Sequence, residues 1–245
     1  MSVASEITRL QNAKASLKTS INAKTNINNQ ITNETIDEYA DFVDSITTGA
    51  VILPDGYTPV NYIKSSGTQY INTGYIPNIN TKINIKCLHG TATSASGAVF
   101  GCRTESTIDR YMLAGNSKKQ AFFWGDVEPD NPHIQSNIST GSFVDVTIEN
   151  SKATFNEEEY TNFSIDTYPN FPIYLFCTNT GGTATAFSTS TIGRFKIYEN
   201  NILIHDFIPC MRNNDSVVGM YDVIDNQFFT YIGTNPFSYG ALYNY

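Results

Sequence analysis

The side chains best suited to chemistry lie between positions 111 and 133. The only tryptophan of the chain, Trp124, stands next to Phe123, and an acidic loop rich in proline follows them. A sugar site needs a flat aromatic face for the apolar side of the ring and Asp, Asn or His side chains for its hydroxyl groups. This stretch therefore favours carbohydrate binding. The candidate contacts are its aromatic and polar side chains: Tyr111, Phe123, Trp124, Asp126, Asn131 and His133.

The same stretch also has a purely structural interpretation. In a strand, successive side chains point to opposite faces, so Phe122 and Trp124 would both point into a core while Phe123 faces the other way. Asp126 would then only open a loop. The core interpretation is the ordinary one for alternating aromatic residues, and the sugar site is its alternative.

The acidic loop also raises the question of a metal. Asp126, Glu128 and Asp130 are spaced like the first ligands of a calcium loop, but Asn131 and Asn137 stand where such a loop has its turn glycine and its distal Glu. We therefore expect a solvated acidic loop and no cofactor, with calcium as the alternative.

The sequence offers little for catalysis. Glycan-cleaving enzymes on β-sandwich folds place an acid and a nucleophile on one strand as E-x-D-x-x-E or a close variant, and no such string occurs. Glu157 to Glu159 instead indicates an exposed turn or edge. His205 and Cys210 combine a base with a nucleophile, but Cys210 follows a proline in an apolar run. We therefore predict that the chain is not an enzyme.

Composition excludes several other classes. The formal net charge of -8 disfavours a nucleic-acid surface, because neutralising phosphates requires clustered Lys and Arg. No apolar run is long enough to span a membrane, and the first residues lack the apolar core of a signal peptide. The four cysteines show no paired spacing, which argues against zinc, and Cys87 and Cys177 lie in apolar runs typical of small core residues.

The residues that must position these side chains show the two-residue period of β-strands. Ile83, Ile85 and Cys87 alternate with polar residues, as do Val144, Val146 and Ile148, whereas residues 171–177 are apolar on both faces, as in a central strand. Residues 178–190 are small and polar and predict an exposed loop. Many short strands separated by glycines favour an antiparallel β-sandwich of the jelly-roll type over residues 57–245.

Two hairpins are expected near the C-terminus. Asn200-Asn201 tolerates positive φ and predicts a two-residue turn that sets Ile197 opposite Ile204 and Tyr198 opposite Leu203. Asp225-Asn226 predicts a second two-residue turn, with Asp222 opposite Phe229.

The first 47 residues differ from the rest. Their apolar spacing predicts a helical hairpin, with helices over residues 5–24 and 35–46, and residues 48–56 form a linker. The hairpin leaves apolar surface uncovered, so it should dock on copies of itself or on another protein. The residues expected to make these contacts are Ile7, Leu10, Leu17, Ile21, Ile36, Tyr39 and Val43.

Two stretches resemble known families. Residues 7–18 and 35–40 are similar to a leader on many tail, baseplate and fibre proteins of bacteriophages, although Lys24-Thr25-Asn26-Ile27 replaces its usual turn. Residues 62–78, together with residues 195–198, 206–210 and 219–222, resemble the concanavalin A/laminin-G-like jelly rolls. The first resemblance implies virion attachment or oligomerisation, and the second implies a lectin-like domain.

These observations combine into one hypothesis. We expect a non-enzymatic virion protein of a bacteriophage tail, baseplate or head fibre, made in the bacterial host cytoplasm. Residues 1–47 would form a homotrimer or bind other virion proteins, and residues 57–245 would bind host-surface glycan. The alternative is a purely structural capsid or tail decoration protein without a sugar ligand. Neither interpretation involves nucleic acid or a membrane.

Overall fold

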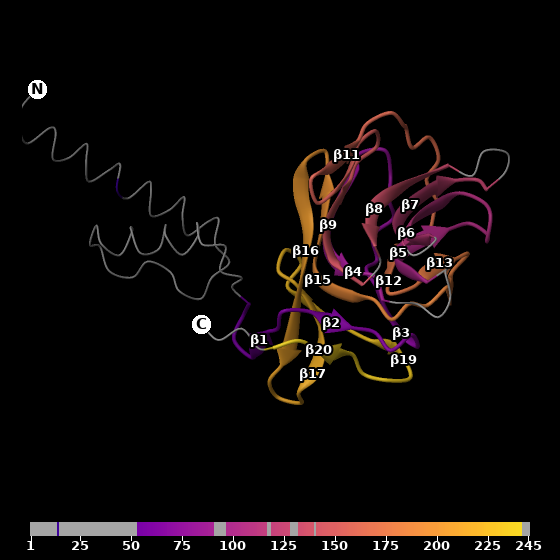
Figure 1. The fold of residues 1–245 in the computed structure, drawn as a ribbon. Coiled ribbons are helices and arrows are strands. Elements are labelled where there is room, and N and C mark those ends of the chain that lie inside the picture. The colour runs from indigo at the N-terminus through magenta and orange to yellow at the C-terminus, as the bar shows by residue number, and fades with distance from the viewer. Residues whose placement is uncertain are drawn as a thin grey trace, which may run out of the picture. The chain divides into compact units, whose positions relative to one another are not determined.

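The structure, a computed structural model, describes residues 53–90, 97–116, 119–127, 132–139 and 141–241, together with Lys14. The chain divides into two units, Met1–Asp55 and Gly56–Tyr245, and the strands that the structure describes belong to the second (Figure 1). The predicted helical hairpin and its contact residues, from Ile7 to Val43, lie outside the described residues, so they remain predictions.

The second unit consists of two β-sheets. The first has the order β11-β10-β9-β4-β15-β16-β17-β18, with three short strands beside this path. Its strands are β1 (Tyr57–Pro59), β2 (Ile63–Lys64), β4 (Thr81–Leu88), β9 (Phe143–Ile148), β10 (Ala153–Phe155), β11 (Glu158–Tyr160), β15 (Thr191–Glu199), β16 (Ile202–Arg212), β17 (Val217–Asp222), β18 (Gln227–Thr230) and β20 (Ser238–Tyr239).

The second sheet has the order β19-β3-β12-β5-β6-β7-β8, with a small hairpin attached to β5. Its strands are β3 (Gln69–Asn72), β5 (Ala98–Arg103), β6 (Arg110–Asn116), β7 (Lys119–Gly125), β8 (His133–Ser139), β12 (Tyr174–Leu175), β13 (Thr178–Thr180), β14 (Thr183–Thr185) and β19 (Ile232–Gly233). Within the described residues every strand pair is antiparallel except β13 with β5.

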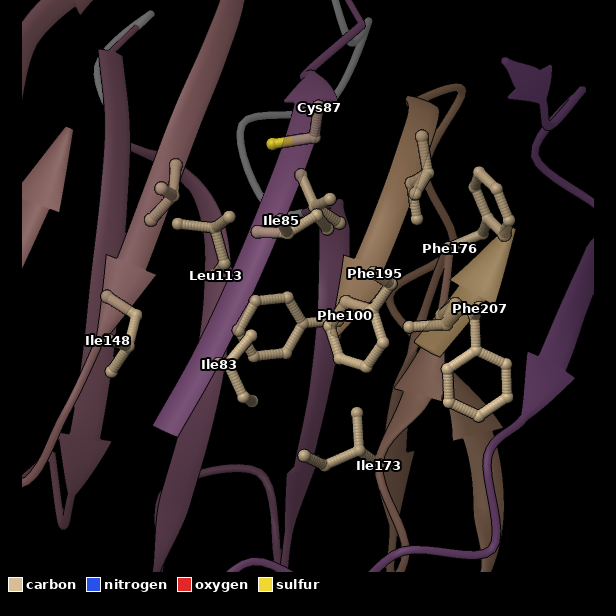
Figure 2. Packing of buried hydrophobic residues seen from close by; sticks show 14 of the residues in the cluster. Ile83, Ile85, Cys87, Phe100, Leu113, Ile148, Ile173, Phe176, Phe195 and Phe207 are labelled. Carbon is tan, nitrogen blue, oxygen red and sulfur yellow. The ribbon is translucent and has the colours of Figure 1, made fainter. Parts of the chain in front are cut away.

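The two sheets pack face to face around one hydrophobic core. Ile83 and Ile85 of β4 point inward, and the alternation predicted for this strand and for β9 is confirmed. The Phe195 ring from the first sheet lies 5.6 Å from the Phe100 ring of the second, so the core joins the sheets directly (Figure 2). Cys87 and Cys177 are buried free thiols, as expected. The chain from residue 56 is therefore mainly β, and it forms an antiparallel sandwich as the sequence predicted.

The hairpin of β15 and β16 was predicted nearly correctly. Asn200 and Asn201 have φ values of 51° and 62° and form its turn, and Tyr198 pairs with Leu203. Ile197, however, pairs with His205 and not with Ile204, because a β-bulge follows Ile197 and adds one residue to β16.

The register predicted for β17 and β18 was wrong. Asp222 pairs with Gln227 and not with Phe229, so the loop contains residues 223–226 and not only Asp225-Asn226. The reason is a side-chain contact: Asp222 Oδ1 accepts hydrogen bonds from the backbone N–H groups of Ile224 and Asp206, each at 3.0 Å. This Asx-type turn ends β17 at Asp222.

Two other expectations needed correction. Residues 173–177 are buried, but only Tyr174 and Leu175 form a strand, because Phe176 has a φ of 69° and ends it. Residues 178–190 are an exposed loop only in part: residues 181–183 are exposed, but β13 and β14 pair there, and Ser188 is buried with its hydroxyl donating to the Ala98 carbonyl at 2.7 Å. The Ser188 hydroxyl can be buried because a backbone carbonyl accepts its hydrogen bond. The prediction for residues 157–159 is confirmed, since β11 is an edge strand.

Candidate functional site

The predicted sugar contacts fall on β7 and its neighbours, and the structure separates them. Tyr111 pairs with Trp124 across β6 and β7. Tyr111 is fully buried, with its ring 5.0 Å from that of Phe122. It therefore has no surface to offer a ligand, and its inclusion among the sugar contacts was wrong. Phe122 and Trp124 are also buried, as the structural interpretation of this strand predicted.

The other face of β7 carries Phe123. Its half-buried ring stacks on the exposed His133 ring at 5.3 Å, and the Arg110 guanidinium lies 5.6 Å from its centroid. Arg110 donates hydrogen bonds to the carbonyl oxygens of Gly125 at 2.9 Å and Asp126 at 3.0 Å. Burial lowers the pKa of Arg110, and the charge of Asp126 opposes this. Arg110 thus fixes the end of β7, and Phe123 does not share a surface with Trp124.

The loop after β7 is described only in part. Asp126 is exposed, and its Oδ1 accepts a hydrogen bond from the Asp109 N–H at 2.9 Å, which ties the loop to the β6 side. Asn131, Glu128 and Asp130 lie outside the described residues, so the predicted sugar contact at Asn131 and the calcium alternative both remain untested.

Trp124 and His133 do meet, in a groove of about 510 Å³ at one edge of the sandwich. Its lining residues come mainly from β8 and from β11 and the segment after it, and β8 and β11 are the last strands of the two sheets. We call it the rim groove. It is lined by Trp124, Pro132, His133, Ile134, Glu159, Tyr160, Thr161, Asn162 and Phe163.

Hydrogen bonds hold the two edges of the rim groove together. Asn137 N–H of β8 donates to Glu158 Oε2 of β11 at 2.9 Å, and this bond lowers the pKa of the Glu158 carboxyl. The Tyr160 hydroxyl oxygen lies 3.2 Å from the Gln135 carbonyl oxygen and 3.1 Å from Glu158 Oε2. Burial, and then the hydrogen bond to Glu158, raise the pKa of Tyr160. The edge strands are therefore cross-linked, and the groove is preformed.

The groove combines aromatic carbon with exposed polar groups. Phe163 packs on Trp124 at 4.9 Å between ring centroids, with 37° between the ring planes. Trp124 is only 7% exposed, so little of its ring is open to a ligand. Among the described residues, no group accepts a hydrogen bond from its indole N–H. His133, Glu159 and Asn162 are exposed beside it and offer donors and acceptors.

The groove residues that follow Glu159 were not predicted from the sequence: Tyr160, Thr161, Asn162 and Phe163. They lie more than 30 positions after Trp124, and only the pairing of β10 with β11 at the sheet edge brings them to β8. The one local signal is their composition, since an aromatic, a hydroxyl, an amide and a second aromatic side chain follow each other directly.

A second cluster of titratable groups lies on β16, on β17 and in the loop after β17. His205 Nδ1 lies 2.7 Å from Asp222 Oδ2 and 3.4 Å from Asp225 Oδ2, and the hydrogen bond to Asp222 raises the pKa of His205. These three side chains are close enough to hold a metal ion, but a His-Asp ion pair explains their geometry. Cys210 is fully buried and burial raises its thiol pKa to about 12, so it cannot act as a thiolate nucleophile at neutral pH.

Comparisons with known proteins give no family. No family model matches the chain, and no curated protein matches it. The carbohydrate-binding module CBM40 of an IT-sialidase from Ruminococcus gnavus is a structural match at 13% identity and a TM-score of 0.43, which covers 56% of this chain and 89% of the module. The same module bound to α2,3-sialyllactose matches at 12% identity and a TM-score of 0.44 over the same shares.

The K499G mutant of NanB sialidase from Streptococcus pneumoniae matches at 8% identity and a TM-score of 0.40, over 76% of this chain and 39% of the sialidase. At these TM-scores, the similarities carry no argument about what the chain binds. Within the described residues, no helix has the length and apolar character needed to cross a membrane.

Proposed function

We propose that the sandwich is a lectin-like domain that binds host-surface glycan in the rim groove. The observation that carries this proposal is the meeting of Trp124, Tyr160 and Phe163 with exposed polar side chains in one preformed groove. The aromatic side chains supply the apolar contact that the carbons of a sugar ring need, and the polar side chains exchange hydrogen bonds with its hydroxyl groups.

The groove contacts would divide between its two edges. His133 on β8 and Asn162 after β11 offer polar groups from opposite sides, so a saccharide lying between them bridges the two sheets. Glu159 is exposed, and its Oε2 forms an ion pair with Lys152 Nζ at 2.6 Å. Its carboxylate can therefore accept a hydrogen bond from a sugar hydroxyl only through the lone pairs that Lys152 does not use. A groove of this kind binds one or two sugar rings weakly, and several copies raise the avidity.

The wider setting is a bacteriophage virion protein of tail, baseplate or head-fibre type, with a sandwich of the jelly-roll type. Support comes from the resemblance of residues 7–18 and 35–40 to phage leaders, which implies that residues 1–47 form a trimer or attach to other virion proteins. The absence of an E-x-D-x-x-E string from these 245 residues supports a non-enzymatic role.

A glycan array probed with the full chain tests the binding proposal. Asn162→Ala removes an exposed amide from the groove, and Trp124→Phe removes the indole N–H while keeping an aromatic core residue. The matched control is Asn214→Ala, an exposed asparagine in the turn between β16 and β17. We expect signals on host-surface glycans that both groove variants weaken and the control preserves, with unchanged thermal unfolding for Asn162→Ala.

The opposite result favours the purely structural alternative. If no glycan binds, or if Asn162→Ala and Trp124→Phe bind as the unchanged chain does, the glycan proposal is wrong. Deleting residues 1–47 and measuring the protein's copy number in purified particles then tests the virion role by itself. Normal incorporation without these residues would refute the attachment role of the leader.

A further inference from the structure

The outer face of the first sheet carries an unusual charge arrangement. On this face Lys86 of β4 lies in register with Arg194 of β15 on one side and Asp145 of β9 on the other. Like charges directly opposite each other destabilise a sheet. Arg194 is drawn toward the buried Asp206 of β16, with which it forms a two-point ion pair. Lys86 is exposed and forms no ion pair with any described residue.

The next row toward the middle of the face is polar. Asn84 of β4 lies between Thr147 of β9 and Lys196 of β15. Its Nδ2 donates to the Thr147 hydroxyl at 2.9 Å, and its Oδ1 is buried with no hydrogen-bond partner among the described residues. Turning the amide over would leave the nitrogen unpaired instead. One polar atom of Asn84 therefore lacks a partner, which points to a ligand group at this position.

The third row supplies an aromatic wall. Tyr198 of β15 is half-buried and pairs with Lys82 of β4, whose Nζ lies 5.8 Å from the ring centroid. Lys82 also forms a 3.0 Å ion pair with Glu149, so its charge is already matched and it holds the ring in place.

These rows surround a groove of about 260 Å³ on the outer face. We call it the outer-face groove. It is lined by Asn84, Ile85, Lys86, Asp145, Val146, Thr147, Arg194, Lys196 and Tyr198. Its floor is the sheet itself, since strand alternation sends Ile85 and Val146 into the core below it.

We propose that the outer-face groove is a second binding site that takes a carboxylate-bearing saccharide. Lys86 and Lys196 line the groove and form no ion pair with any described residue. They lie in a chain whose net charge is -8, and in this proposal they bind the ligand's carboxylate. The unpaired amide of Asn84 binds a ring hydroxyl, and the Tyr198 ring covers the apolar face of the sugar.

The charge balance distinguishes this ligand from a nucleic acid. Asp145 lies in the groove and Asp206 neutralises Arg194, so few free positive charges remain. Binding a phosphate backbone requires a row of Lys and Arg side chains, whereas one carboxylate requires only one or two. The saccharide class therefore fits the groove better, and this site does not depend on the rim groove.

Calorimetric titration of the full chain with trigalacturonic acid, a hyaluronan tetrasaccharide and fully methyl-esterified trigalacturonic acid tests the proposal. The ester keeps the sugar rings and removes the charge. We expect an acidic probe to bind, the ester to bind at least about tenfold more weakly, and added salt to weaken the acid alone. Lys86→Gln or Lys196→Gln should each lower the affinity about threefold, as expected for an exposed charge pair.

The controls separate this site from the rim groove. Lys64→Gln removes an exposed lysine from β2, and Asn162→Ala alters only the rim groove, so both should leave acidic binding unchanged. The proposal is wrong if neither acidic probe binds at millimolar concentration or if ester and acid bind equally. It is equally wrong if only Asn162→Ala abolishes binding, or if a single-stranded oligonucleotide binds this groove more tightly than the acidic sugars.

Discussion

Asp222 is the residue at which a single substitution should most disturb the first sheet. Its side chain is fully buried at the end of β17 and accepts three hydrogen bonds. Two come from backbone N–H groups, those of Asp206 and Ile224, and the third comes from His205. The carboxylate thus joins β16, β17 and the turn that follows. Asp222→Ala leaves all of these donors without their acceptor.

The magnitude follows from these contacts. Taking about 1 kcal/mol for each backbone N–H bond and about 2 kcal/mol for the ion pair with His205, Asp222→Ala should lower the free energy of unfolding by about 4 kcal/mol. Asp222→Asn keeps an oxygen for both backbone N–H groups but removes the charge opposite His205. It should cost about 2 kcal/mol near pH 5.5.

The pH dependence has a defined direction. The hydrogen bond to Asp222 raises the pKa of His205 above 6.5, so this contribution is complete below pH 6.5 and is lost as the pH rises through the folded-state value. Burial tends to raise the pKa of Asp222, but hydrogen bonds from His205 and the backbone outweigh it and leave that pKa below 3.8. The pair therefore stabilises the fold most between about pH 4 and pH 6.5.

Urea unfolding of the full chain, followed by the fluorescence of its single tryptophan, measures these effects. The control is Asp215→Ala, which removes an exposed ion pair with Arg212 and should cost less than about 1 kcal/mol. If Asp222→Ala costs no more than this control, the network does not stabilise the sheet. A stability difference between Asp222→Asn and the unchanged chain that is the same at pH 5.5 and pH 9 would contradict the charge assignment to His205.

Other predictions concern the core, the turn and the thiols. Phe195→Ala should lower the unfolding free energy by about 3 to 5 kcal/mol, because its ring joins the two sheets; a loss below about 1 kcal/mol in urea unfolding would contradict this packing. Asn200→Val should lower the melting temperature, since a β-branched residue does not tolerate its positive φ, whereas Asn201→Gly should not; equal effects would refute the assigned turn. All four cysteines are buried free thiols and should react with Ellman's reagent only after unfolding; rapid reaction of the native chain would show an exposed thiol.

The strands were predictable where one face is buried and the other is wet. Ile83, Ile85 and Cys87 alternate with polar neighbours, so the sequence pattern predicts which face of the strand is buried. The register of a hairpin was predictable only where the turn residues themselves determine the turn, as Asn200 and Asn201 do through their positive φ. The prediction of the turn after β17 was wrong because the Asp222 side chain accepts hydrogen bonds from backbone N–H groups. One of these groups belongs to Asp206 of β16, which is distant in sequence.

The candidate site was predictable only in part. Trp124 and His133, two of the predicted sugar contacts, line the same groove, but sequence alternation cannot show that Tyr111 is covered by Tyr168 and Phe122. The opposite edge of the rim groove comes from β11, which is distant in sequence and exposed at the end of its sheet. Long-range pairing of this kind leaves no spacing pattern in the chain.

The fluorescence of Trp124 during glycan titration is the most direct test of the rim groove, because the chain has no other tryptophan and this one lines the groove. For a glycan identified on the array, we predict a saturable change in emission whose affinity matches calorimetry, falls in Asn162→Ala and persists in Asn214→Ala. Calorimetric binding of that glycan with no change in Trp124 emission, and with the same affinity in Asn162→Ala, would contradict it.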